Sequence, residues 1–104
     1  MKIVRVTYTT NLEFAERNQR NIQAVMTDLK NRNYAGINYT VCLNADGKTF
    51  VHTAFFNTDN DQQLLNDLVS FKYFQEQLKS GGLEVAPKQE LLTLIGSSTS
   101  IFNI

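Results

Sequence analysis

The stretch that decides the fold is residues 36–57, which read GINYTVCLNADGKTFVHTAFFN. Two runs rich in β-branched and aromatic residues, INYTVCLN and KTFVHTAFF, flank the segment NADG at 44–47. Such runs are typical of strands, and this segment is typical of a turn. A three-residue hairpin loop with Gly47 in the left-handed conformation pairs Asn44 with Lys48. The stretch therefore predicts an antiparallel hairpin.

This register places the side chains of the hairpin on two unlike faces, because side chains alternate across a strand. The nearly apolar face carries Ile37, Tyr39, Val41, Leu43, Val51, Thr53 and Phe55. The mixed face carries Asn38, Thr40, Cys42, Phe50, His52, Ala54 and Phe56. A two-residue turn would instead pair Val41 with His52 and break this segregation, so the pattern favours the longer turn. Neither face is polar throughout, and we expect both to be covered.

A strand and a helix precede the hairpin. Residues 2–9 alternate, with Val4, Val6 and Tyr8 on one side. Apolar residues then recur at helical spacing from 11 to about 32, which predicts an amphipathic helix. Its start has the spacing of a capping box between Thr10 and Glu13.

After the hairpin, the sequence predicts a helix over 62–68, a second helical segment that Ser70 caps and Gly81 ends, and a last strand over 88–96. The tail, 97–104, is apolar at its end, and we expect it to dock on its own domain or on a partner. The chain is thus one domain, 1–104, with a core over 1–96.

The order β-α-β-β-α-β predicts a ferredoxin-like α+β fold, a four-stranded antiparallel sheet with two helices on one face. Because two helices cover only that face, the other face requires a further cover. A second copy of the chain, packed sheet against sheet, would supply it with closed two-fold symmetry. We therefore expect a homodimer, although the tail could cover part of the same face.

Composition limits the classes of partner. The 104 residues include ten basic and ten acidic side chains, so the net charge is zero, and no basic cluster predicts a nucleic-acid partner. No apolar run is long enough to predict a membrane span. The single cysteine, Cys42, excludes an intramolecular disulfide and is typical of a reducing compartment, so the expected location is cytoplasmic.

The layout resembles the dimeric α+β barrel superfamily, particularly the antibiotic-biosynthesis-monooxygenase group. The segments that carry the resemblance are KIVRVTYT, the long first helix, the hairpin strand TFVHTAFF, the helix start SFKYF and the closing strand ELLTLIG. The resemblance implies a dimeric α+β barrel, a ligand cavity between sheet and helices, and chemistry that includes cofactor-free oxygenation of polyketide-like molecules.

His52 is the one natural acid-base candidate, because its ordinary pKa lies near neutrality. On the predicted mixed face, its neighbours are Asn38 and Thr40 from the adjacent strand and Arg5 from the first strand. An arginine there would keep the imidazole neutral and stabilise an anion. The alternative is that these residues form a polar patch buried in the dimer interface.

The resemblance implies a ligand cavity between the sheet and the helices, and the apolar face would line it with aromatic side chains. Its expected walls are Tyr8, Tyr39, Thr53, Phe55, Met26, Phe71 and Phe74, with Asn18 nearby. The alternative is ordinary core packing without a ligand. One histidine and one cysteine without clustered carboxylates predict no metal site, and we expect no cofactor.

The hypothesis is a homodimer that binds a small aromatic or polyketide-like molecule. As an enzyme it would be a cofactor-independent monooxygenase or an isomerase, with His52 as base and Arg5 as charge stabiliser. The expected substrate-binding residues are Tyr8, Asn38, Tyr39, Thr40, Phe55 and Phe74. The alternative is a non-catalytic dimeric binding or stress-response module.

Overall fold

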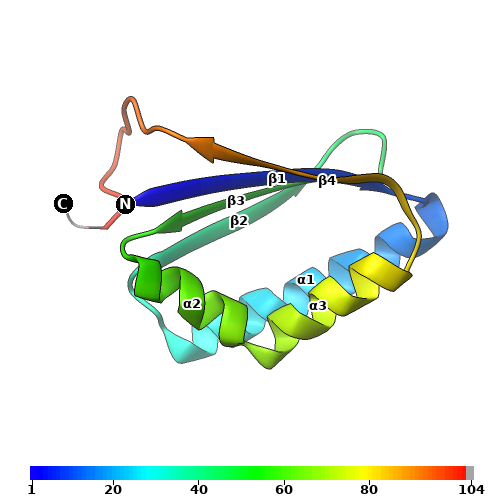
Figure 1. The fold of residues 1–104 in the computed structure, drawn as a ribbon, viewed down its shortest axis with the longest axis horizontal. Coiled ribbons are helices and arrows are strands. Elements are labelled where there is room, and N and C mark those ends of the chain that lie inside the picture. Colours follow the sequence, from blue (N-terminus) through cyan, green and yellow to red (C-terminus); the bar gives the residue numbers. More distant parts are fainter. Residues whose placement is uncertain (103–104) are drawn as a thin grey trace.

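The computed structural model of the chain describes residues 1–102. Its elements are β1 (Lys2–Thr10), α1 (Leu12–Arg32), β2 (Ile37–Leu43), β3 (Thr49–Phe56), α2 (Asp59–Asp67), α3 (Val69–Ser80) and β4 (Leu83–Leu92). The strands form one antiparallel sheet in the order β2-β3-β1-β4. All three helices lie on one face of this sheet (Figure 1). The predicted ferredoxin-like α+β fold is confirmed.

The core lies between the sheet and the helices. Tyr8, Phe50 and Phe56 supply its largest fully buried aromatic side chains from the strands. The helices contribute the buried side chains Phe14, Ala15, Ile22, Val25, Leu65, Phe71, Phe74 and Leu78. As predicted, the apolar stripe of α1 faces this core, and the apolar stripe of α3 packs beside it.

The predicted register of the hairpin is wrong by one residue on β3. The backbone N–H of Asn44 donates to the carbonyl of Thr49 (2.9 Å), and the loop therefore holds four residues, 45–48. The reason is Asp46, whose carboxylate accepts from the backbone N–H groups of Lys48 (3.0 Å) and Thr49 (2.9 Å). These bonds keep Lys48 in the loop and delay the start of β3.

The shifted register reverses the faces of β3, because a one-residue slip moves every side chain to the other side. Val41 now lies opposite His52, and Tyr39 lies opposite Ala54. His52 is therefore buried under the helices with 5% of its surface exposed. Thr53 and Phe55, predicted to lie under the helices, point to the open face instead.

The helix boundaries differ in detail from the prediction. Asn11, rather than Thr10, caps α1, with its side-chain oxygen accepting from the backbone N–H of Phe14 (2.7 Å). A capping box does occur at the start of α2, between Thr58 and Asp61. Ser70 does not cap α3 but donates its hydroxyl to Asp28 (3.0 Å) and so ties α3 to α1.

The last strand also lies earlier than predicted, over Leu83–Leu92 rather than 88–96. Its ladder with β1 ends at the pair of Leu92 with Ile3, close to the start of β1. Pro87 is tolerated because β4 is an edge strand and its register shifts at this point.

Gly82, which joins α3 to β4, is expected to tolerate no side chain. Its φ is +106°, and a Cβ would collide with the side-chain amide of Asn11. We expect Gly82→Ala to lower the free energy of unfolding by about 1–3 kcal/mol, as for strained backbone generally. Urea unfolding measures this. Gly96→Ala is the matched control, since nothing lies within 4 Å of its Cβ, and equal midpoints for the two variants would contradict the prediction.

The described part of the tail docks on its own domain. Ile101 and Phe102 are half-buried and share a shallow pocket with Tyr34 and Ile37 at the start of β2. The remaining apolar residue of the predicted tail, Ile104, lies outside the described residues.

No helix among residues 1–102 is long and apolar enough to cross a membrane.

Candidate functional site

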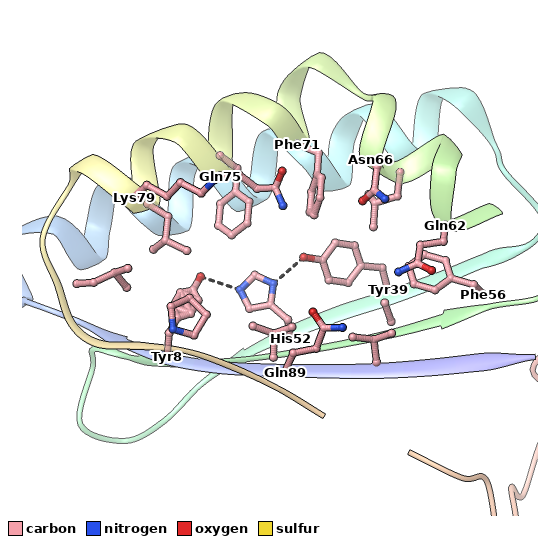
Figure 2. Close-up of a pocket in the computed structure, with 18 residues that line it drawn as sticks. Tyr8, Tyr39, His52, Phe56, Gln62, Asn66, Phe71, Gln75, Lys79 and Gln89 are labelled. Carbon is pink, nitrogen blue, oxygen red and sulfur yellow. Dashed lines mark hydrogen bonds between the residues drawn. The ribbon is translucent and has the colours of Figure 1, made fainter. Parts of the chain in front are cut away.

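A cavity of about 350 Å³ lies between the helix-facing side of the sheet and helices α2 and α3. Its floor comes from all four strands and its roof from α2 and α3 (Figure 2). The lining residues are Val4, Val6, Tyr8, Tyr39, His52, Ala54, Phe56, Gln62, Leu65, Asn66, Phe71, Phe74, Gln75, Leu78, Lys79, Leu83, Pro87 and Gln89. Its size and apolar walls are those of a small-molecule site.

The cavity has aromatic walls that pack on one another. The rings of Phe71 and Phe74 lie 5.8 Å apart between centroids, and Tyr39 meets Phe71 edge-on at 6.4 Å. The ring centroid of His52 lies 5.4 Å from that of Phe74. These contacts fix the rings in place, and fixed ring faces and edges favour a flat aromatic ligand.

Four polar side chains form a hydrogen-bonded chain across the floor. The Nδ2 amide of Asn18, on α1, donates to the hydroxyl of Tyr8 (2.8 Å). That hydroxyl lies 2.7 Å from Nε2 of His52, and the hydroxyl of Tyr39 lies 2.6 Å from Nδ1. Figure 2 shows the two tyrosines on either side of the imidazole. Both ring nitrogens of His52 are therefore occupied.

Burial keeps the ionisable side chains of this hydrogen-bonded series uncharged. It lowers the pKa of His52 to about 4, so the imidazole is neutral near pH 7. Burial also raises the pKa values of Tyr8 and Tyr39 well above the ordinary value for a phenol. A neutral imidazole has one N–H donor and one acceptor nitrogen, so it accepts from one tyrosine and donates to the other.

Asn18 determines which tyrosine donates to His52 and which accepts from it. If Nε2 carried the proton, the Tyr8 oxygen would accept from both Asn18 and His52, and its own hydroxyl proton would need another acceptor. Tyr8 is only 1% exposed, so burying an unpaired donor there is costly. The favoured order of donation is therefore Asn18 to Tyr8, Tyr8 to His52 and His52 to Tyr39. The hydroxyl proton of Tyr39 is then not needed within this hydrogen-bonded chain.

The structure brings together half of the residues that the sequence predicted for the site. Four of the eight line the cavity: Tyr8, Tyr39, His52 and Phe74. Asn18, expected near the pocket, is also in place, fully buried behind Tyr8.

The other four predicted residues, Arg5, Asn38, Thr40 and Phe55, do not line this cavity. Their side chains lie on the open face of the sheet. Arg5, Asn38 and Thr40 keep the face predicted for them, but the shifted register moves His52 away from that face and brings Phe55 onto it. Arg5 pairs there with Glu90 on β4 (2.9 Å), so it cannot hold the His52 imidazole neutral. Burial does that instead.

Sequence reasoning missed the polar rim of the cavity: Gln62, Asn66, Gln75, Lys79 and Gln89. A signal for two of them existed. Gln75 and Lys79 lie four and eight residues after Phe71, so helical spacing places them beside the apolar stripe of α3. Within residues 1–102, no group of three or more His, Cys, Asp or Glu side chains could hold a metal ion.

Comparison with solved structures identifies the fold. An antibiotic biosynthesis monooxygenase superposes with a TM-score of 0.73 at 8% identity, over 92% of this chain and 100% of that one. The protein Rv0793 of Mycobacterium tuberculosis gives 0.76 at 13%, over 94% and 98%. This chain has the antibiotic biosynthesis monooxygenase fold. SnoaB, a cofactor-independent oxygenase of Streptomyces nogalater solved as a mutant, gives 0.67 at 11%, over 95% and 98%.

No protein-family model and no curated protein matches the sequence. At these identities the likeness to antibiotic biosynthesis monooxygenases is one of fold, and one fold hosts many functions. Any function therefore depends on the cavity and its hydrogen-bonded floor.

Proposed function

We propose that the chain binds a flat aromatic molecule in the cavity and promotes its oxygenation by O₂ without a cofactor. The observation that carries the proposal is the hydrogen-bonded floor, in which three buried neutral groups direct one hydroxyl, that of Tyr39, towards a ligand. The fold shared with a cofactor-independent oxygenase supports the same class of reaction.

The geometry favours a role in which the hydrogen-bonded floor donates a hydrogen bond to the ligand. A ligand hydroxyl that loses its proton becomes an oxyanion, and a preorganised donor in a water-poor site stabilises that anion strongly. Tyr39 supplies the donor, and His52 acts through it as a positioning residue because both of its nitrogens are already hydrogen-bonded. The ligand binds as this anion, having lost its proton to bulk water.

The anion can then react with O₂ directly. It transfers one electron to O₂, and the resulting aromatic radical and superoxide combine to form a carbon–oxygen bond. The peroxide takes up a proton and loses water as its O–O bond breaks, which leaves a carbonyl on the ring. For anthrone the balance is anthrone plus O₂ to anthraquinone plus water, so the substrate supplies all the electrons.

Anthrone oxygenation tests the proposal. Wild-type protein is expected to consume one O₂ per anthrone faster than buffer alone and to form anthraquinone. We expect Ala54→Leu to lower this acceleration by at least about 10-fold, because the added methylenes occupy ring space in the cavity. Thr53→Val, on the other face of the same strand, is the matched control. Absence of acceleration, or full activity in Ala54→Leu, would contradict the proposal.

We also propose a homodimer that packs through the open faces of two sheets. Half-buried apolar side chains on that face, Val51 and Phe55 among them, lie beneath no helix. Their burial by a second copy would favour association. Sedimentation at micromolar concentration tests this, with a monomer as the contradicting outcome.

We propose a cytoplasmic location as well, which the free thiol of Cys42 supports.

A further inference from the structure

The residues that line the cavity carry a net positive charge, although the whole chain has none. The chain has equal numbers of acidic and basic side chains, yet Lys79 is the one formally charged residue among those that line the cavity. Among residues 1–102, no carboxylate lines it, and His52 is neutral near pH 7. The cavity therefore carries a single positive charge that no lining group compensates.

Lys79 has no ion-pair partner among residues 1–102, whereas Lys48 pairs with Glu84. It lies in the last turn of α3, one helical turn after Gln75, and both side chains line the cavity. Residues four apart on a helix are neighbours on its surface. An ammonium group and a carboxamide N–H thus stand side by side at the cavity.

The two polar features lie in different places along the cavity. Figure 2 shows Lys79 at the end near Tyr8, and Gln62 and Asn66 at the other end, near Phe56. The hydroxyl of Tyr39 points between these ends, beside His52. A ligand whose reactive oxygen meets Tyr39 can therefore extend a second polar group towards Lys79.

We propose that this ligand is an aromatic carboxylate, with its carboxylate bound by Lys79 and Gln75. The proposal rests on aromatic binding in the cavity and adds the acidic group. Two donors match the two oxygens of a carboxylate, and the single charge of Lys79 matches its single negative charge. Lys79 is then a specificity-determining residue, which selects acids over neutral molecules with the same ring system.

Two probes that share one ring system test the selection. The affinities of 2-naphthoate and the neutral 2-naphthamide are measured by calorimetry at pH 7 and low ionic strength. We expect wild-type protein to bind the acid about 3- to 10-fold more tightly, as for a partly exposed ion pair with an added hydrogen bond. The preference should fall as NaCl is raised.

Three variants locate the effect. Lys79→Met is expected to reduce the ratio of the two affinities to about one, because it removes the charge that distinguishes the acid from the amide. Lys79→Arg is expected to keep the preference, because the charge remains. Lys72→Met is the matched control, since Lys72 is exposed on the same helix but does not line the cavity.

Each other outcome overturns the proposal in a recognisable way. Equal binding of acid and amide by wild-type protein would refute the carboxylate and leave aromatic binding intact. Loss of the preference in Lys72→Met as well as Lys79→Met would assign it to the general field of the helix. Failure of both probes to bind would remove the aromatic ligand and the carboxylate together.

Discussion

Tyr39→Phe is expected to lower kcat for anthrone oxygenation by about 10²- to 10³-fold, the loss that follows removal of one oxyanion donor. The physical reason is that Tyr39 is the end of the hydrogen-bonded floor and the one group in it with a proton free for the ligand. KM should change little, because the ring of Phe occupies the same wall against Phe71. Oxygen uptake at several anthrone concentrations separates the two constants.

The matched control for this prediction is Tyr73→Phe. Tyr73 lies on α3 with 52% of its surface exposed and does not line the cavity, so the loss of its hydroxyl should leave kcat unchanged. The kcat of Tyr8→Phe should lie between those of Tyr39→Phe and Tyr73→Phe. This variant removes the group that sets the His52 tautomer but leaves Tyr39. Wild-type kcat in Tyr39→Phe would refute the donor role.

Acidification is expected to destabilise the protein through His52. Its pKa is about 4 when folded and near 6.5 when exposed, so between these values the unfolded chain binds more protons. Stability is therefore fully present above pH 6.5 and is lost as the pH falls towards 4. At 1.36 kcal/mol per pKa unit, the free energy of unfolding should fall by about 2 kcal/mol between pH 7.5 and pH 5.

Because His52 is the chain's one histidine, His52→Gln isolates this effect. Glutamine can donate to one tyrosine and accept from the other but does not titrate. Urea unfolding at pH 7.5 and pH 5 measures both proteins, and carboxylates such as Glu90 contribute equally to each. The loss on acidification should be about 2 kcal/mol smaller in His52→Gln. Equal losses in the two proteins would show that His52 is not buried as a neutral group.

Local patterns were sufficient to predict the architecture. The period of apolar residues in 11–32 indicated a helix, and alternation in 2–9 placed Val4, Val6 and Tyr8 on one face, where the structure has them. Asn18 was also expected near the pocket, and it is the start of the hydrogen-bonded floor. Burial and periodicity are encoded by neighbouring residues, so they can be read from the sequence.

The register of the hairpin could not be read in the same way. Two registers fitted the hairpin around the segment at 44–47, and the apolar pattern of β3 favoured the wrong one, because both of its faces carry aromatic residues. The bonds from the Asp46 carboxylate to Lys48 and Thr49 decide between them. They shift β3 by one residue and move His52 from the open face to the cavity.

The sequence by itself therefore determined the order of elements, the antiparallel sheet with helices on one face, and the aromatic composition of a pocket. Only the tertiary structure decided which polar groups meet there. Asn18, Tyr8, His52 and Tyr39 come from α1, β1, β3 and β2, and their contact depends on strand register and helix packing over up to 44 residues of separation. No local pattern specifies such contacts, because a slip of one residue leaves local propensity unchanged and exchanges the two faces of the strand.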